Sequence, residues 1–99
     1  RDYLHEHFRR RVTIAELAEV GGLSPFHLIR LFRARVGLPP YMYLEHLRVE
    51  RAKALLAAGT PLAEAARDTG FGDQSHFTRR FKLLVGVPPG RYARQVLRT

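Results

Sequence analysis

An internal repeat constrains the fold of this 99-residue chain more than any other feature of its sequence. Shifted by 49 positions, residues 24–43 overlay residues 73–92, and eight of the twenty aligned pairs are identical. A chain of this length folds as one domain or as two very small subdomains that share an interface. The repeat favours two copies of one small unit. The identical pairs are His27/His76, Arg30/Arg79, Phe32/Phe81, Val36/Val85, Gly37/Gly86, Pro39/Pro88, Pro40/Pro89 and Tyr43/Tyr92, and upstream, at a shift of 48, Ala15/Ala63, Glu16/Glu64, Ala18/Ala66 and Gly22/Gly70.

The local sequence predicts helices throughout, because no segment alternates between apolar and polar residues with period two. Thr13 followed by Glu16 forms a capping-box pattern for a helix that ends at Gly21-Gly22. Ser24-Pro25 places an N-cap before a proline at the first helical position, and that helix runs to Gly37. We therefore expect an all-α fold of about seven helices. The other expected helices cover residues 2–10, about 40–58, 60–70 and 73–86, and a last short one follows Pro88-Pro89 and extends to Leu97.

Each copy of the repeat contains a short helix, a glycine turn and a longer helix, which is the helix-turn-helix pattern. In that pattern the second helix enters the major groove of DNA. The first subdomain covers about residues 1–39, a linker helix about 40–58, and the second subdomain about 60–99. About nineteen helical residues span roughly 28 Å, and successive major-groove faces lie about 34 Å apart. The linker can thus hold two recognition helices near one-turn spacing, and bending of the DNA would absorb any mismatch.

Basic charge is concentrated in two parts of the chain. The 17 Lys and Arg against nine Asp and Glu give a net charge of +8 and a pI near 11.0. Residues 24–43 and 74–99 contain no acidic residue. This sorting indicates a polyanionic partner, either nucleic acid or an anionic membrane surface. The alternative is a pair of solvated basic helix faces.

The 100° spacing of helical residues predicts which side chains face outward. Leu28 and Phe32 in the first copy, and Phe77 and Phe81 in the second, are the expected core. Arginine can bridge O6 and N7 of guanine, glutamine can pair with adenine, and serine or threonine can serve either base. Apolar side chains can contact thymine methyl groups. The predicted outward set is Pro25, Phe26, Ile29, Arg30 and Arg33 on the first helix, and Gln74, Ser75, Thr78, Arg79 and Lys82 on the second.

The inner faces follow from the same spacing. In the first copy, Ile14, Leu17 and Ala18 are expected to face Leu28, Leu31 and Phe32. In the second copy, the corresponding apolar sets are Leu62, Ala65 and Ala66 against Phe77, Phe81 and Leu84.

One stretch of the chain is especially specific: GFGDQSHFTRRFK at residues 70–82, followed by Gly86-Val87-Pro88-Pro89 and Tyr92. It is accompanied by Ser24, His27-Leu28, Arg30, Phe32, Gly37, Arg48, Ala52 and Leu55-Leu56. Through these residues, nearly the whole chain resembles the DNA-binding domain of the AraC/XylS family of bacterial transcription regulators.

The resemblance implies seven helices, sequence-specific binding of double-stranded promoter DNA through adjacent major grooves, and contacts with RNA polymerase that raise or lower transcription. It also implies a separate N-terminal effector or dimerisation domain outside this chain, and a place in the bacterial cytoplasm at the nucleoid. Two positions depart from the family pattern: Ile29 replaces a frequent polar reader, and Ala93 replaces a common basic residue. The base-reading positions of the family fall on Phe26, Ile29, Arg30, Gln74, Ser75, His76, Thr78 and Arg79.

Several other interpretations stay open at this point. His27 and His76 are either base contacts or packed, capping imidazoles, and Ile29 is either a methyl contact or partly buried. Arg48 and Arg51 either brace the subdomains or contact DNA. Non-specific DNA binding and an RNA-polymerase interaction module are the rival functions.

The sequence argues against an enzyme and against a membrane protein. It contains no P-loop, no nucleophile–base pair and no converging acids. We expect no cofactor and no metal, because the chain has no cysteine and His5 and His7 point apart on a helix. No run of eighteen apolar residues is present, so we expect no membrane span.

Overall fold

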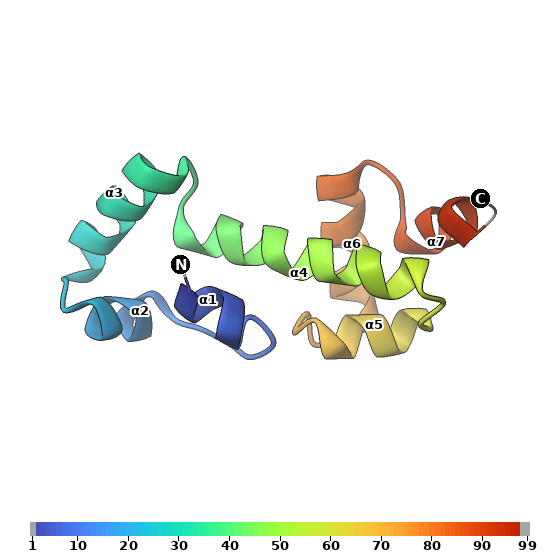
Figure 1. Ribbon diagram of the computed structural model, residues 1–99, viewed down its shortest axis with the longest axis horizontal. Coiled ribbons are helices and arrows are strands. Elements are labelled where there is room, and N and C mark those ends of the chain that lie inside the picture. Colours follow the sequence, from blue (N-terminus) through green and yellow to red (C-terminus); the bar gives the residue numbers. More distant parts are fainter. Residues whose placement is uncertain (1, 98–99) are drawn as a thin grey trace.

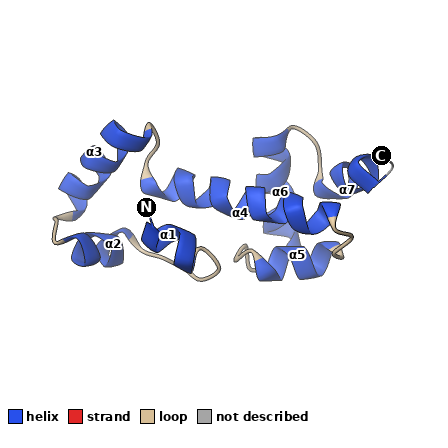
Figure 2. Ribbon diagram, in the orientation of Figure 1, coloured by secondary structure: helices blue, strands red, loops and turns tan. Residues whose placement is uncertain are grey.

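The computed structural model describes residues 2–97, which form seven helices and no strand (Figures 1 and 2). The predicted all-α fold is therefore confirmed. Arg98, in the second acid-free stretch, lies outside the described residues. The elements are α1 Asp2–His7, α2 Ile14–Gly21, α3 Pro25–Val36, α4 Pro40–Ala57, α5 Leu62–Asp68, α6 Gln74–Val85 and α7 Pro89–Leu97.

The two longer helices of the repeat, α3 and α6, begin in the same way. The Ser24 side chain accepts a hydrogen bond from the backbone N–H of His27 at 3.2 Å. Asp73 does the same for the N–H of His76 at 2.7 Å. Each cap satisfies one of the free N–H groups of a first helical turn, so the sequence sets both start points locally. The helix α1, by contrast, ends at His7, three residues before the expected end.

The helix α4 is a central rod that contributes to two separate hydrophobic cores. Its first half supplies Tyr43 and Leu44 to a core with Leu4 and Leu17. Its second half supplies Val49, Ala52 and Leu56 to a larger core. Eighteen residues make this rod about 27 Å long. The other buried members of the larger core are Ala65, Ala66, Phe71, Phe77 and Phe81.

The two longer helices of the repeat, α3 and α6, are separated along the long axis of the molecule. In Figure 1, α3 lies near one end of α4 and α6 crosses the other half, and both helices run upward from their N-termini. The molecule measures 46 × 22 × 21 Å along its principal axes. This elongated arrangement is the predicted one, with two small helix-turn-helix units on one rod.

The first subdomain is less tightly packed than the sequence predicts. No residue of α3 is fully buried, and Phe32 packs against its core while half-exposed. Leu31, expected to face inward, is 42% exposed, so that prediction is wrong. Its position lies 60° away from Leu28 around the helix, at the edge of the inner face. At the equivalent position of α6 stands Arg80, which pairs with Glu45 on α4.

Candidate nucleic-acid interface

The α3 surface brings together the predicted apolar and basic side chains. Phe26 is 69% exposed and Ile29 is 37% exposed. The guanidinium carbon of Arg30 lies 5.5 Å from the centre of the Phe26 ring, which is a cation–π contact. Arg33 is exposed one turn further along the helix. These four side chains therefore share one outward face of α3.

The α6 surface gathers the predicted polar side chains in one place. Gln74, Ser75, Thr78 and Arg79 line a single shallow hollow. Thr78 is half-buried, whereas the other three residues are exposed. Lys82 is exposed and, with Arg79, lines an adjoining hollow. The second helix thus presents donors and acceptors where the first presents an aromatic and an aliphatic side chain.

The two repeated histidines have different surroundings. The Nδ1 atom of His27 lies 3.3 Å from the Ser24 Oγ, beside the N-cap of an exposed helix start. His76 is half-buried, and its ring lies 5.8 Å from the ring of Phe71. Both rings therefore have contacts within the protein: the His27 ring lies beside the N-cap of α3, and the His76 ring packs against Phe71.

Most basic side chains of α3 and α6 lack acidic partners in the part of the chain that the structure describes. Within residues 2–97, no ion pair involves Arg30, Arg33, Arg79 or Lys82. Neither α3 nor α6 contains an acidic residue. Because no acidic side chain in the described residues neutralises them, these four exposed charges can meet phosphates or base edges.

Arg80 is the exception on α6. Its Nε and Nη2 atoms donate to the two carboxylate oxygens of Glu45 at 2.5 and 2.6 Å. This bidentate pair raises the pKa of Arg80, chiefly through the hydrogen bonds to Glu45. Glu45 therefore pairs with Arg80 and not with Arg48, three residues further along α4, whereas Glu50 and Lys53 of α4 do pair, at 3.5 Å. The Arg80–Glu45 pair fixes α6 against the rod.

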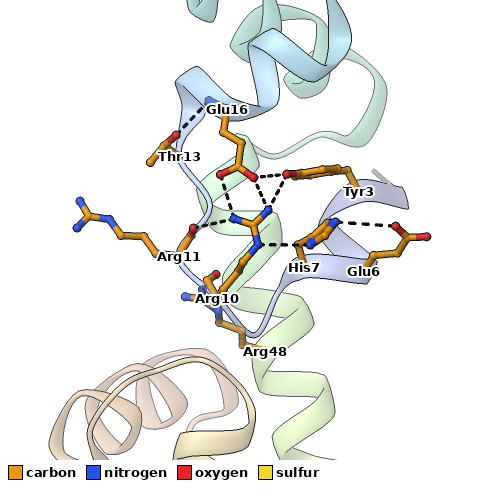
Figure 3. A network of polar contacts seen from close by, with 8 residues as sticks. All are labelled: Tyr3, Glu6, His7, Arg10, Arg11, Thr13, Glu16 and Arg48. Carbon is orange, nitrogen blue, oxygen red and sulfur yellow. Dashed lines mark hydrogen bonds and ion pairs between the residues drawn. The ribbon is translucent and has the colours of Figure 1, made fainter.

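A polar network that the sequence did not reveal joins α1 to α2 (Figure 3). The Arg10 guanidinium donates to both carboxylate oxygens of Glu16 and, at 2.6 Å, to the hydroxyl of Tyr3. Tyr3 in turn donates to Glu16. The hydrogen bonds from Arg10, and then from Tyr3, lower the pKa of Glu16 to about 2. Glu16 therefore anchors α2, and its own backbone N–H donates to the N-cap side chain of Thr13.

The side chain of Arg48 extends from α4 toward the segment between α1 and α2. Its Nε donates to the carbonyl of Phe8 at 2.7 Å, and its Nη2 donates to the carbonyl of Arg10 at 2.9 Å. Its guanidinium carbon also lies 5.9 Å from the centre of the Phe71 ring in the second subdomain. Burial lowers the pKa of Arg48. The bracing interpretation is thus confirmed for Arg48, whereas Arg51 is exposed.

Two other kinds of site are absent from the part of the chain that the structure describes. Among residues 2–97, no group of three or more His, Cys, Asp or Glu is arranged to hold a metal ion. No helix in this range has both the length and the apolar character needed to cross a bilayer.

Two helix-turn-helix units on one rod, each with an exposed, acid-free second helix, define a DNA-binding domain of the double helix-turn-helix class. Comparison with known proteins gives the family. Residues 17–95 match the family described as helix-turn-helix domain. The chain belongs to this family and is an AraC-type helix-turn-helix DNA-binding domain.

Individual relatives agree with this assignment. The HTH-type transcriptional regulator YbfI of Bacillus subtilis is 43% identical over 75 residues, which are 76% of this chain and 27% of YbfI. The C-terminal domain of AraT, a response regulator from Geobacillus stearothermophilus, superimposes with a TM-score of 0.90 at 31% identity, over 95% of this chain and 79% of that one. The DNA-binding domain of AdpA, a global transcriptional factor, in complex with a target DNA, gives a TM-score of 0.89 at 25% identity. The match covers 95% of this chain and 86% of that one. This chain thus spans about a quarter of the length of YbfI.

Proposed function

We propose that this domain binds double-stranded promoter DNA sequence-specifically, with α3 and α6 in adjacent major grooves. The observation that carries the proposal is the pair of exposed, acid-free helices, capped alike and mounted on one rod. A recognition helix reads bases with side chains near its N-terminus, where Phe26, Arg30, Gln74 and Arg79 stand.

Each candidate side chain of α3 and α6 has a proposed contact with a base or a phosphate. Arg30 and Arg79 bridge O6 and N7 of guanine, and Gln74 pairs with adenine. Ser75 and Thr78 bond either base, while Arg33 and Lys82 contact phosphates. His76 is a weaker candidate for base contact, because its ring packs on Phe71. Phe26 and Ile29 contact thymine methyl groups.

The dimensions support simultaneous binding of two grooves. The molecule is 46 Å long, and adjacent major-groove faces on one side of B-DNA lie about 34 Å apart. One chain can therefore present both helices to one face of a duplex, as a dimer of single helix-turn-helix units does.

In the longer regulator, we propose that this domain works with an N-terminal effector or dimerisation domain and contacts RNA polymerase. The greater length of the relatives supports a further domain. That AdpA is bound to a target DNA supports the DNA partner. The regulator acts in the bacterial cytoplasm, on DNA of the nucleoid.

In vitro selection of bound duplexes from a random pool tests the proposal. We expect a motif of two different blocks about one helical turn apart. With several phosphate contacts, affinity should fall by about 10³–10⁵ between 50 and 200 mM salt. Selection of a single short block would contradict two-groove binding. Equal affinity for scrambled duplexes would favour non-specific binding, and an absence of salt dependence would favour a protein-interaction module.

A further inference from the structure

The first and second subdomains touch beside the rod, where the segment after α1 meets the turn after α5. The segment after α1 supplies the backbone carbonyls of Phe8, Arg9 and Arg10, and the turn after α5 supplies Gly70 and Phe71. Arg48 lies between them, with its donors on two of the carbonyls and its guanidinium near the Phe71 ring. We call these five residues and Arg48 the joint.

Gly70 shows how close the two backbones are. A Cβ atom at this position would lie 2.7 Å from the carbonyl oxygens of both Phe8 and Arg9. Gly22, the equivalent residue of the first copy, would have nothing within 4 Å of its Cβ. Both glycines have positive φ, +67° at Gly22 and +88° at Gly70. The turn therefore needs glycine in both copies, but only Gly70 also needs it for contact between subdomains.

The joint is connected directly to the second recognition helix. The Phe71 ring lies 5.3 Å from the ring of Phe77, which is fully buried in α6. It also lies 5.8 Å from the ring of His76 at the start of that helix. Because packed cores deform little, a shift at the joint would move α6 relative to the first subdomain.

We propose that the joint fixes the spacing and rotational phase of the two recognition helices, and that Arg48 is the positioning residue that holds it. This inference rests on the proposed reading of one duplex by both helices. Arg48 touches no base in this role. It determines which separation between two blocks of sequence the protein accepts.

The physical reason is the effective concentration of the second helix at its site. Once one helix is bound, a rigid connection places the other at high local concentration for one spacing only. A base-pair insertion moves the second block by about 3.4 Å and rotates it by roughly 35°. A loosened joint would spread the second helix over several positions. The affinity for the best spacing would then be lower, and the affinity for neighbouring spacings would fall less below it.

The test is a spacer series made from the duplex selected by the wild-type domain, with one base pair inserted or deleted between the blocks. We expect the wild type to prefer its own spacing by about 100-fold, and Arg48→Met and Gly70→Ala to reduce this preference to below about tenfold. Arg48→Met keeps the aliphatic stem but removes the donors. Arg48→Lys, which keeps a point charge without the fork, should restore part of the preference.

Matched controls separate the joint from general damage. Arg51→Met removes an exposed arginine of the same helix, and Gly22→Ala imposes the same backbone strain without the contact. Both should keep the wild-type spacing preference. Affinity for duplexes that carry a single block reports whether each unit is folded, and it should be unchanged in all variants.

Two outcomes would overturn the inference in distinguishable ways. If Arg48→Met and Gly70→Ala both keep the wild-type preference, the joint does not set the spacing, while two-groove reading stands. If the wild-type domain itself accepts every spacing equally, the proposed function fails, and the inference fails with it.

Discussion

Replacement of Arg79 by alanine should weaken binding to the selected DNA without affecting the fold. Arg79 is exposed on α6 and makes no ion pair in the described part of the chain. Its removal should therefore change the free energy of unfolding by less than about 0.5 kcal/mol. A lost bidentate contact with guanine costs about 1–3 kcal/mol, which corresponds to about a 5- to 150-fold increase in Kd. Preference at one base pair of the second block should relax, while preference at the other positions stays.

Arg80 is the matched control, because it is the next residue on the same helix and has a different environment. Its bidentate partner Glu45 is only 17% exposed, so Arg80→Ala leaves a largely desolvated carboxylate without its donors. We expect a loss of about 1–3 kcal/mol in unfolding free energy and an unchanged base preference. The assay is fluorescence anisotropy against every single-base-pair variant of the site, together with urea unfolding. If Arg79→Ala weakened all duplexes alike, or if both variants behaved the same, the assignment of Arg79 as a base reader would be refuted.

Two further predictions concern stability. The pKa of Glu16 is about 2 against an ordinary 4.5, so its contribution to stability is complete above about pH 4.5 and disappears as the pH falls toward 2. In urea unfolding from pH 2 to 7, Glu16→Gln should be less stable than the wild type at neutral pH and should lose less stability on acidification. An identical pH profile for the two proteins would contradict the role of the network. Phe81→Ala should cost about 3–5 kcal/mol because the ring is fully buried in the larger core. Leu83→Ala, at a side chain that is 66% exposed, should change stability by less than about 0.5 kcal/mol in the same thermal or urea measurement, and equal losses would contradict the assigned packing.

The helices and their order could be predicted because their signals are local. A hydroxyl or carboxylate at the N-cap, as at Ser24 and Asp73, accepts from the N–H three residues further on, and this signal depends on no other part of the fold. The 100° spacing of helical residues then gave the outward faces of α3 and α6, once the apolar side chains of each copy were assigned to the core. Exposure of Phe26 and Arg79 agrees with that placement.

The partners of charged residues could not be predicted, because several candidates were available and the choice depends on tertiary structure. Glu45 has a basic residue three positions along α4, yet it pairs with Arg80, 35 residues away. Arg48 instead donates hydrogen bonds to backbone carbonyls 38 and 40 residues upstream. The exposure of Leu31 has a similar origin: a helical wheel gives the direction of a side chain but not whether a neighbouring helix extends far enough to cover it.

The divergence of the two copies gives the proposed DNA site a direction. The identical pairs are mostly those that build the unit, such as Phe32/Phe81 in the cores, whereas the outward pairs Phe26/Ser75 and Ile29/Thr78 differ. A symmetric dimer of one helix-turn-helix reads the same block twice, so its operators are palindromic. Under the proposed function, an apolar reader and a polar reader are joined in fixed order by one rod, so we expect the two blocks to differ in sequence. We then expect the domain to bind in a single orientation, so that any contact with a protein bound at one side of the site depends on which way the site points.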